Sequence, residues 1–228
     1  MAPPLPRAHF LGVPLEIRVK IYEHFFALLG SYWIYFSDEE MDRWARKIFP
    51  TYPGSHLFAL LYTNQQINME AIAVFFRIIT LHVSPEFVPG NPSSLVAFTD
   101  RIGCHNAALL CRVDISFPAT VKRPDGDLEL EAPSVQTLCH LKARCPGLTR
   151  LRFWNCIYSR KVFDQYQRNP SSVSAVLAEI NGLVRGIAPL RNIIVYTGEN
   201  VVLSPEFKEF LHNLGWEIDA KKYRYSEN

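Results

Sequence analysis

Apolar positions change their spacing within residues 57–83. The first part repeats at three and four residues, which places its members on one helix face. These members are Leu57, Leu60, Leu61, Asn64, Ile67, Asn68 and Ala71. Residues 80–83 alternate instead, as the two faces of a strand do. The pattern predicts a helix that leads directly into a strand.

Residues 11–26 predict an earlier helix. Pro14 suits the first turn, and a carboxylate at Glu16 interacts favourably with the helix dipole. One apolar row contains Ile17, Ile21 and Phe25, and a second contains Leu15, Val19, Tyr22 and Phe26. Because two rows exceed the single buried face of an ordinary surface helix, we expect one of them to contact a partner.

Two blocks in these helices resemble the F-box-like proteins of filamentous fungi. The first block, Leu-Pro-x-Glu-Ile-Arg-x-Lys-Ile-Tyr-Glu, matches at Pro14, Glu16, Ile17, Arg18, Lys20, Ile21, Tyr22 and Glu23. The second matches at Leu60, Leu61, Thr63, Gln66, Ile67, Glu70, Ala71, Phe75 and Phe76. Asn64 and Gln65 replace the usual Cys-Arg pair, and Ile79 replaces a usual Asn. The resemblance covers about residues 11–83.

This resemblance implies a non-enzymatic adaptor that docks on the linker subunit of a cullin-RING ubiquitin ligase and presents an unknown substrate protein. The expected docking residues are Leu11, Pro14, Leu15, Ile17, Ile21 and Tyr22. We expect an extended arm at residues 1–10, then an F-box-like helical module at 11–77. An aromatic insertion at 30–53 interrupts the module.

Residues 78–222 predict an irregular leucine-rich-repeat-like α/β region, followed by a tail at 223–228. Four segments share the spacing apolar-x-x-apolar-x-apolar, and they start at Ile78, Leu110, Leu148 and Leu190. Helical patterns at 134–145, 174–187 and 204–213 lie between or after these segments. The predicted fold class is therefore α/β, with a parallel sheet and helices on one side.

Polar strand positions in this sheet would point away from the helices. We expect these positions to bind the substrate: Arg112, Asp114, Arg150, Arg152, Trp154, Asn192 and Tyr196. The alternative is an ordinary solvated sheet face. Residues 118–133, with three prolines and Asp125-Gly126, predict a long polar loop.

Composition adds bounds on the partner and on the compartment. A formal net charge of +2 is too small to imply a polyanion partner, and no apolar stretch reaches the roughly 20 residues of a membrane span. The N-terminus lacks the apolar core of a secretory signal. Five cysteines form an odd set that suits a reducing compartment, and we expect them to be buried thiols. We therefore expect the protein to be located in the cytoplasm or the nucleus.

Catalytic and cofactor chemistry finds no support in the sequence. Cys104, His105 and Cys111, like Cys139, His140 and Cys145, lack the two-to-four-residue spacing of paired zinc ligands. The glycines are scattered and form no phosphate loop. We therefore expect no enzyme activity, no metal and no cofactor.

Two alternatives to the ligase adaptor stay open. The first is an RNA or ribonucleoprotein-associated factor, because basic residues alternate with aromatic ones between residues 144 and 168. These are Arg144, Arg150, Arg152, Arg160, Lys161 and Arg168, with Phe153, Trp154, Tyr158 and Tyr166. The nearly neutral total charge argues against it. The second is a structural subunit of a larger assembly that keeps only the F-box-like fold.

Overall fold

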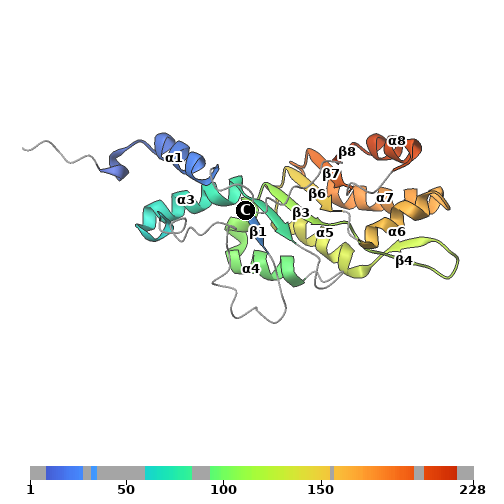
Figure 1. Ribbon diagram of the computed structural model, residues 1–228. Coiled ribbons are helices and arrows are strands. Elements are labelled where there is room, and N and C mark those ends of the chain that lie inside the picture. The colour runs from blue at the N-terminus through green and yellow to red at the C-terminus, as the bar shows by residue number, and fades with distance from the viewer. Residues whose placement is uncertain are drawn as a thin grey trace, which may run out of the picture.

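A six-stranded parallel sheet forms the centre of the protein, as the computed structural model shows (Figure 1). The structure describes residues 9–27, 32–34, 60–83, 93–154, 157–197 and 203–219. The strands, in their order across the sheet, are β1 (Tyr32–Ile34), β2 (Thr80–Val83), β3 (Arg112–Ser116), β6 (Arg150–Trp154), β7 (Asn192–Tyr196) and β8 (Trp216–Asp219). Strand order in the sheet is thus strand order in the chain.

Helices connect the strands, because parallel neighbours require a crossover between them. The helices are α1 (Leu15–Ala27), α3 (Gln65–Ile78), α4 (Ser93–Ala108), α5 (Ala132–Arg144), α6 (Ile157–Tyr166), α7 (Pro170–Arg185) and α8 (Pro205–Asn213). Two short 3-10 turns, η1 (Phe10–Gly12) and η4 (Leu60–Tyr62), precede α1 and α3. The predicted α/β class with a parallel sheet is confirmed.

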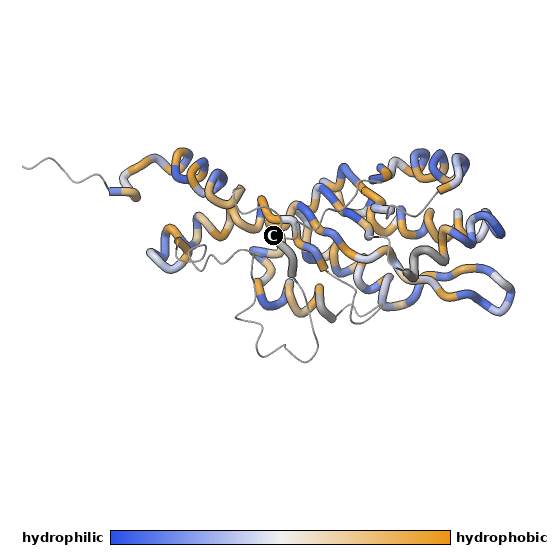
Figure 2. The backbone as a smooth tube through the Cα atoms, viewed as in Figure 1, coloured by the Kyte–Doolittle hydropathy of each residue, from blue (hydrophilic) through white to orange (hydrophobic). Residues whose placement is uncertain are grey.

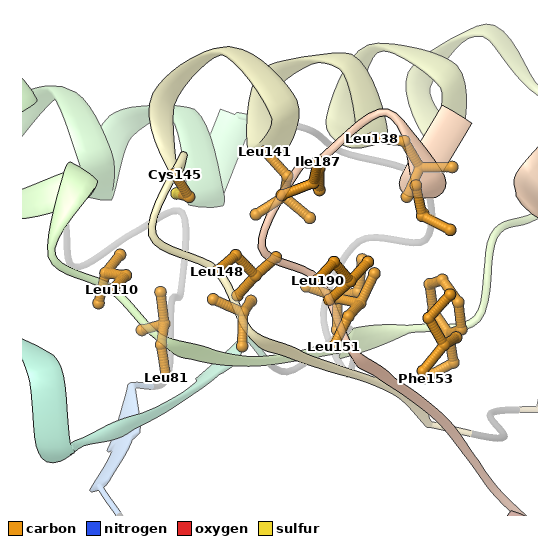
Figure 3. Close-up of a cluster of buried hydrophobic side chains, with 14 of the residues drawn as sticks. Leu81, Leu110, Leu138, Leu141, Cys145, Leu148, Leu151, Phe153, Ile187 and Leu190 are labelled. Carbon is orange, nitrogen blue, oxygen red and sulfur yellow. The ribbon is translucent and has the colours of Figure 1, made fainter. Parts of the chain in front are cut away.

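The core lies between the strands and the helices (Figure 3). Leu81, Val113, Leu151 and Ile193 are fully buried and occupy one row across four neighbouring strands. Alternate positions on the same strands face the opposite side, so hydrophobic and hydrophilic residues alternate along them (Figure 2). Leu138 and Leu141 of α5 cover the apolar row. The predicted spacing therefore identified the inward strand positions.

The helix ends explain why several predicted elements stand where they do. Ser204 caps α8, since its Oγ accepts a hydrogen bond of 3.2 Å from the Phe207 N–H, and Pro205 takes the first helical position. Gly215 then adopts a φ of +74°, and the chain enters β8. The predicted helix at 204–213 and the strand after it are confirmed.

The predicted helix within residues 57–83 begins later than its apolar pattern suggested. Asn64 has extended backbone and caps α3, because its Oδ1 accepts a 2.8 Å hydrogen bond from the Gln66 N–H. Leu60 and Leu61 lie in η4 instead, and Leu57 lies outside the described residues. Helix α3 then reaches β2 through Ile79 alone, so the helix that leads into a strand is confirmed.

Three elements differ from the sequence expectation. Residues 118–133 contain a β-hairpin of β4 (Thr120–Lys122) and β5 (Leu128–Leu130), where we predicted a loop. Helices α4 and α6 were not predicted. Gly103, at a φ of +80°, kinks α4 and breaks its apolar period. Aromatic and basic residues hid the amphipathic pattern of α6.

The aromatic insertion contributes the edge strand β1, which pairs in parallel with β2. A segment from the range 11–77 therefore forms the edge of the sheet whose other five strands lie within residues 78–222. The remainder of the insertion, residues 1–8, Ala220 and the tail at 223–228 lie outside the described residues. Within the described ranges, we find no helix both long and apolar enough to cross a membrane.

Candidate functional site

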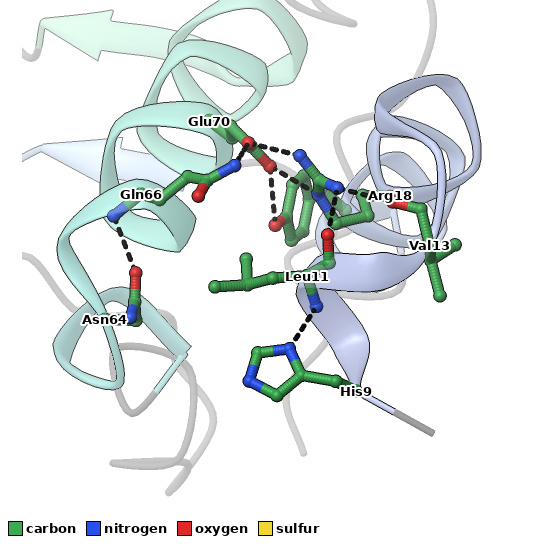
Figure 4. A network of polar contacts seen from close by, with 8 residues as sticks. His9, Leu11, Val13, Arg18, Asn64, Gln66 and Glu70 are labelled. Atoms are coloured by element: carbon green, nitrogen blue, oxygen red, sulfur yellow. Dashed lines mark hydrogen bonds and ion pairs between the residues drawn. The ribbon is translucent and has the colours of Figure 1, made fainter. Parts of the chain in front are cut away.

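Helices α1 and α3 pack against each other around one ion pair (Figure 4). Arg18 Nη2 lies 2.6 Å from Glu70 Oε1, and Arg18 Nε donates to Glu70 Oε2 at 2.9 Å. Both side chains are largely buried. Arg18 comes from the first sequence block and Glu70 from the second, so the ion pair joins the two blocks directly.

Further hydrogen bonds complete this pair. Tyr22 Oη donates to Glu70 Oε2 at 3.1 Å, and Gln66 Nε2 donates to Glu70 Oε1 at 2.9 Å. Arg18 Nη1 donates to the carbonyl oxygens of Leu11 and Val13 in the chain that precedes α1. Hydrogen bonds from Arg18, above all, lower the pKa of Glu70 to about 2. The network therefore fixes both α1 and the residues that precede it against α3.

An exposed apolar row lies on α1, away from this network. Ile17 and Ile21, one turn apart, are each 45% exposed, although such side chains are usually buried; Leu15, on another side of the first turn, is 47% exposed. Ile17 and Ile21 line a shallow groove of about 380 Å³ together with Lys20, His24 and Phe25. Large side chains of this kind on one helix face are typical of a protein-binding surface.

The structure separates the six expected docking residues. Pro14, Leu15, Ile17 and Ile21 are exposed, whereas Leu11 is half-buried and packs against the core. Tyr22 has no exposed surface, because its ring packs in the core and its hydroxyl bonds Glu70. The expectation that Tyr22 contacts a partner is wrong for this conformation. Tyr22 instead packs between α1 and α3 and helps to hold α1 in place.

The second candidate surface is the sheet face opposite the helices. Strand register places Arg112, Arg150 and Asn192 in one row, Asp114 beside Arg152 in the next, and Trp154 beside Tyr196 in the last. All seven expected substrate-binding residues therefore share one face. This juxtaposition follows from parallel pairing without any shift in register.

Charges on this face pair with one another across the strands. Asp114 Oδ2 lies 3.0 Å from His82 Nδ1 and 3.6 Å from Arg152 Nη1, and Arg152 Nη2 lies 3.6 Å from Asp219 Oδ2. Asp114 is fully buried and Tyr196 is 8% exposed. In this conformation Asp114 holds the face together and does not reach a partner, whereas Arg112 and Asn192 are exposed.

Our sequence analysis missed several polar residues of this face. His82, Glu217 and Asp219 belong to it through the register of β2 and β8. Asn192 Nδ2 donates to Glu217 Oε1 at 2.8 Å, and Arg150 Nη2 donates to Thr80 Oγ1 at 3.0 Å. The strand alternation of residues 80–83 and 216–219 was a usable signal, because it already assigned these positions to the outward side.

Two residues from the rows that suggested RNA or metal binding contact neighbouring elements. Arg144 Nη2 pairs with Asp100 Oδ1 at 3.0 Å, which neutralises part of the basic row. His140 Nε2 lies 2.6 Å from the buried Thr99 Oγ1 and ties α5 to α4. No three His, Cys, Asp or Glu side chains come together as metal ligands in the described part of the chain.

The expectation of buried thiols is wrong for two of the described cysteines. Cys104 and Cys139 are exposed on α4 and α5, and Cys111 is half-buried. Cys145 alone among the four described thiols is buried, and burial raises its pKa to about 12.

Comparisons with known proteins identify no relative of this chain. No protein-family model matches the chain, and neither a curated protein nor a solved structure matches it. The assignment of function therefore depends on the two surfaces described above.

Proposed function

We propose that this protein is a non-enzymatic protein-interaction adaptor that resembles the substrate-receptor subunit of an F-box-type, cullin-RING ubiquitin ligase. In this proposal α1 docks on the linker subunit of the ligase, in the cytoplasm or the nucleus. The irregular leucine-rich-repeat-like region, from β2 to β8, presents the substrate. The chain brings two proteins together and does not carry out chemistry itself.

One observation carries the proposal: the exposed apolar row of Ile17 and Ile21 lies on a helix that a buried ion pair holds in place. Ordering a flexible helix would cost part of the binding free energy, and a helix already fixed in the free protein avoids that cost. The Arg18–Glu70 network supplies this preorganisation. Figure 1 shows α1 and α3 at one end of the molecule, at the opposite end from the β4–β5 hairpin.

The strand order supports the second half of the proposal. Successive strands are neighbours throughout the sheet, which is the arrangement of a ribbon of repeats. The order leaves one sheet face to polar residues, among which Arg112 and Asn192 are exposed. A curved or flat ribbon of this kind offers a continuous surface to another protein.

The test is affinity purification of the tagged full chain from its native cells, followed by mass spectrometry. We expect recovery of the linker subunit and the cullin with the wild-type chain and loss of both with the double variant Ile17→Asp/Ile21→Asp. An aspartate in each exposed position disrupts apolar docking without changing the core. Val121→Asp is the matched control, because Val121 is equally exposed on the distant hairpin, and this variant should retain both subunits.

Other results would reject the ligase proposal. Nuclease-sensitive recovery of ribonucleoprotein would favour the RNA-associated factor, and one stoichiometric complex without a cullin would favour the structural subunit. Equal recovery of the linker subunit with the double variant and with Val121→Asp would exclude α1 as the docking helix.

A further inference from the structure

A second groove lies between the β4–β5 hairpin and helices α5 and α7. Its volume is about 950 Å³. The hairpin that lines it lies at the opposite end of the molecule from α1 (Figure 1). Apolar side chains from all four elements line it: Val121, Leu128, Leu130, Pro133, Val135 and Val176. The groove therefore combines apolar side chains with charged ones from the same elements.

The hairpin that forms one wall is fixed by hydrogen bonds to the helices. The Leu128 N–H donates to Ser172 Oγ of α7 at 2.6 Å, and the Ala119 N–H donates to Ser134 Oγ of α5 at 2.9 Å. Within the turn, the Arg123 N–H donates to the Asp127 carbonyl at 2.7 Å. The groove is thus a preformed feature, which favours binding at a low ordering cost.

Val121 is unusual in its exposure. Most of the large hydrophobic side chains with marked exposure in the described ranges lie on α1, η4 and α3: Leu15, Ile17, Ile21, Tyr62 and Met69. Val121 is the remaining one, 45% exposed at the groove. Val121 therefore supplies exposed apolar surface at the groove, away from the α1 row.

The occupant is identified by charge. One arginine, Arg123, and three glutamates, Glu129, Glu131 and Glu179, line the groove, which leaves two negative charges in a chain of formal net charge +2. Arg123 Nε pairs with Glu129 Oε2 at 2.6 Å, so Glu131 and Glu179 supply the excess. An acidic rim repels nucleic acid and anionic lipid, and it attracts lysine and arginine side chains.

The shape of the occupant follows from the hairpin. In a two-stranded sheet each strand has one edge outside the pairing, and ladder bonds at Ala119–Glu131 and Arg123–Asp127 direct the backbone groups of Thr120 and Lys122 away from β5. An extended peptide can align with such an edge and place alternate side chains in the groove.

We propose that this groove binds an extended basic peptide segment of a partner protein, with apolar residues next to lysine or arginine. The inference deepens the proposed function and rests on it in one respect: the segment belongs to the substrate that the adaptor presents. Apolar residues contact the partly exposed Val121, Leu128 and Val135, and the basic residues lie near Glu131 and Glu179.

The test is selection of a random displayed peptide library on the purified full chain, followed by fluorescence anisotropy of the enriched peptides. We expect enriched sequences rich in lysine and arginine. Ala175→Trp fills the groove from α7 and should abolish binding, because Ala175 is an exposed lining residue. Ala143→Trp is the matched control on α5, exposed and about 10 Å along the helix from the lining residue Gln136, and it should bind as the wild type does.

A charge variant tests the identity of the occupant. Glu131→Gln/Glu179→Gln keeps the shape of the groove and should weaken the same peptides about three- to tenfold at low salt, with a smaller effect at high salt. Failure to enrich any peptide, enrichment without basic residues, or equal binding by Ala175→Trp and Ala143→Trp would each overturn the proposal.

The outcome is separable from that of the ligase proposal. Ile17→Asp/Ile21→Asp leaves the groove intact and should keep peptide binding while it loses the linker subunit. Peptide binding in the groove without any recovery of a cullin would retain this inference and reject the ligase proposal. Recovery of the cullin without peptide binding would retain the ligase proposal and reject this inference.

Discussion

Arg18 and Glu70 lie 52 residues apart in the chain and form a two-pronged ion pair, with Nη2–Oε1 at 2.6 Å and Nε–Oε2 at 2.9 Å. This geometry uses the planar fork of the guanidinium, which a lysine cannot reproduce. The pair joins α1 to α3, because Arg18 belongs to the first helix and Glu70 to the second. It also leaves the apolar row of α1 on the outside.

The stability of the protein should depend on pH through Glu70. The pKa of Glu70 falls to about 2 in the folded protein from an ordinary value of 4.5, chiefly through hydrogen bonds from Arg18. Folding therefore favours the ionised carboxylate, so the pair stabilises the fold above about pH 4.5 and loses this effect as the pH falls toward 2. Urea unfolding of wild type and Glu70→Gln should show a difference that is largest near neutral pH and shrinks below pH 4.5.

The isosteric glutamine is the control for this effect, since it retains the shape and part of the hydrogen bonding but does not titrate. A difference between the two proteins that stays constant from pH 7 to pH 3 would show that the ionisation of Glu70 does not account for its contribution to stability.

Ile193 and Ile194 test the assignment of the two sheet faces with one residue type. Ile193 is fully buried under the helices, whereas its neighbour Ile194 points to the polar face and is partly exposed. Ile193→Ala should lower the free energy of unfolding by about 2–5 kcal/mol, because it leaves a cavity. Ile194→Ala should cost less than about 1.5 kcal/mol. Urea denaturation measures both, and equal losses would contradict the assignment.

Asp114 should be the most sensitive carboxylate of the polar face. Replacement by alanine removes one partner of His82 and one partner of Arg152 in a buried site, and the expected loss is about 3–5 kcal/mol. Asp100→Ala breaks the exposed pair with Arg144 and should cost less than about 1 kcal/mol. Thermal or urea unfolding measures the loss of stability in each variant. A loss for Asp114→Ala as small as that for Asp100→Ala would mean that Asp114 does not stabilise the polar face.

The cysteines should differ in their reactivity. Cys104 and Cys139 are exposed and should react with iodoacetamide in the native protein at pH 8. Cys145 is buried with a pKa of about 12, so neither access nor ionisation allows its reaction until the protein unfolds. Peptide mapping by mass spectrometry, with and without urea, measures each site. Native labelling of Cys145 would show that the end of α5 opens readily.

Much of the fold could be predicted from local patterns in the sequence. The change of spacing before Thr80 identified α3 and β2, and the cap at Ser204 identified α8, because both signals depend on neighbouring residues only. The four similar apolar segments identified the inward positions of their strands. The kink at Gly103 and the hairpin after Phe117 were missed, since their local composition is typical of turns.

The sequence by itself determined most of the helices and strands of the sheet region and which strand positions are apolar, because these properties follow from backbone geometry and side-chain chemistry over a few residues. Only the tertiary structure decided which apolar row of α1 is buried and which polar residues of the sheet pair with each other. Tyr22 and Ile21 are adjacent and equally suited to a core, yet Glu70, distant in the chain, fixes Tyr22 inside and leaves Ile21 exposed. Such contacts depend on where remote segments meet, which local patterns do not specify.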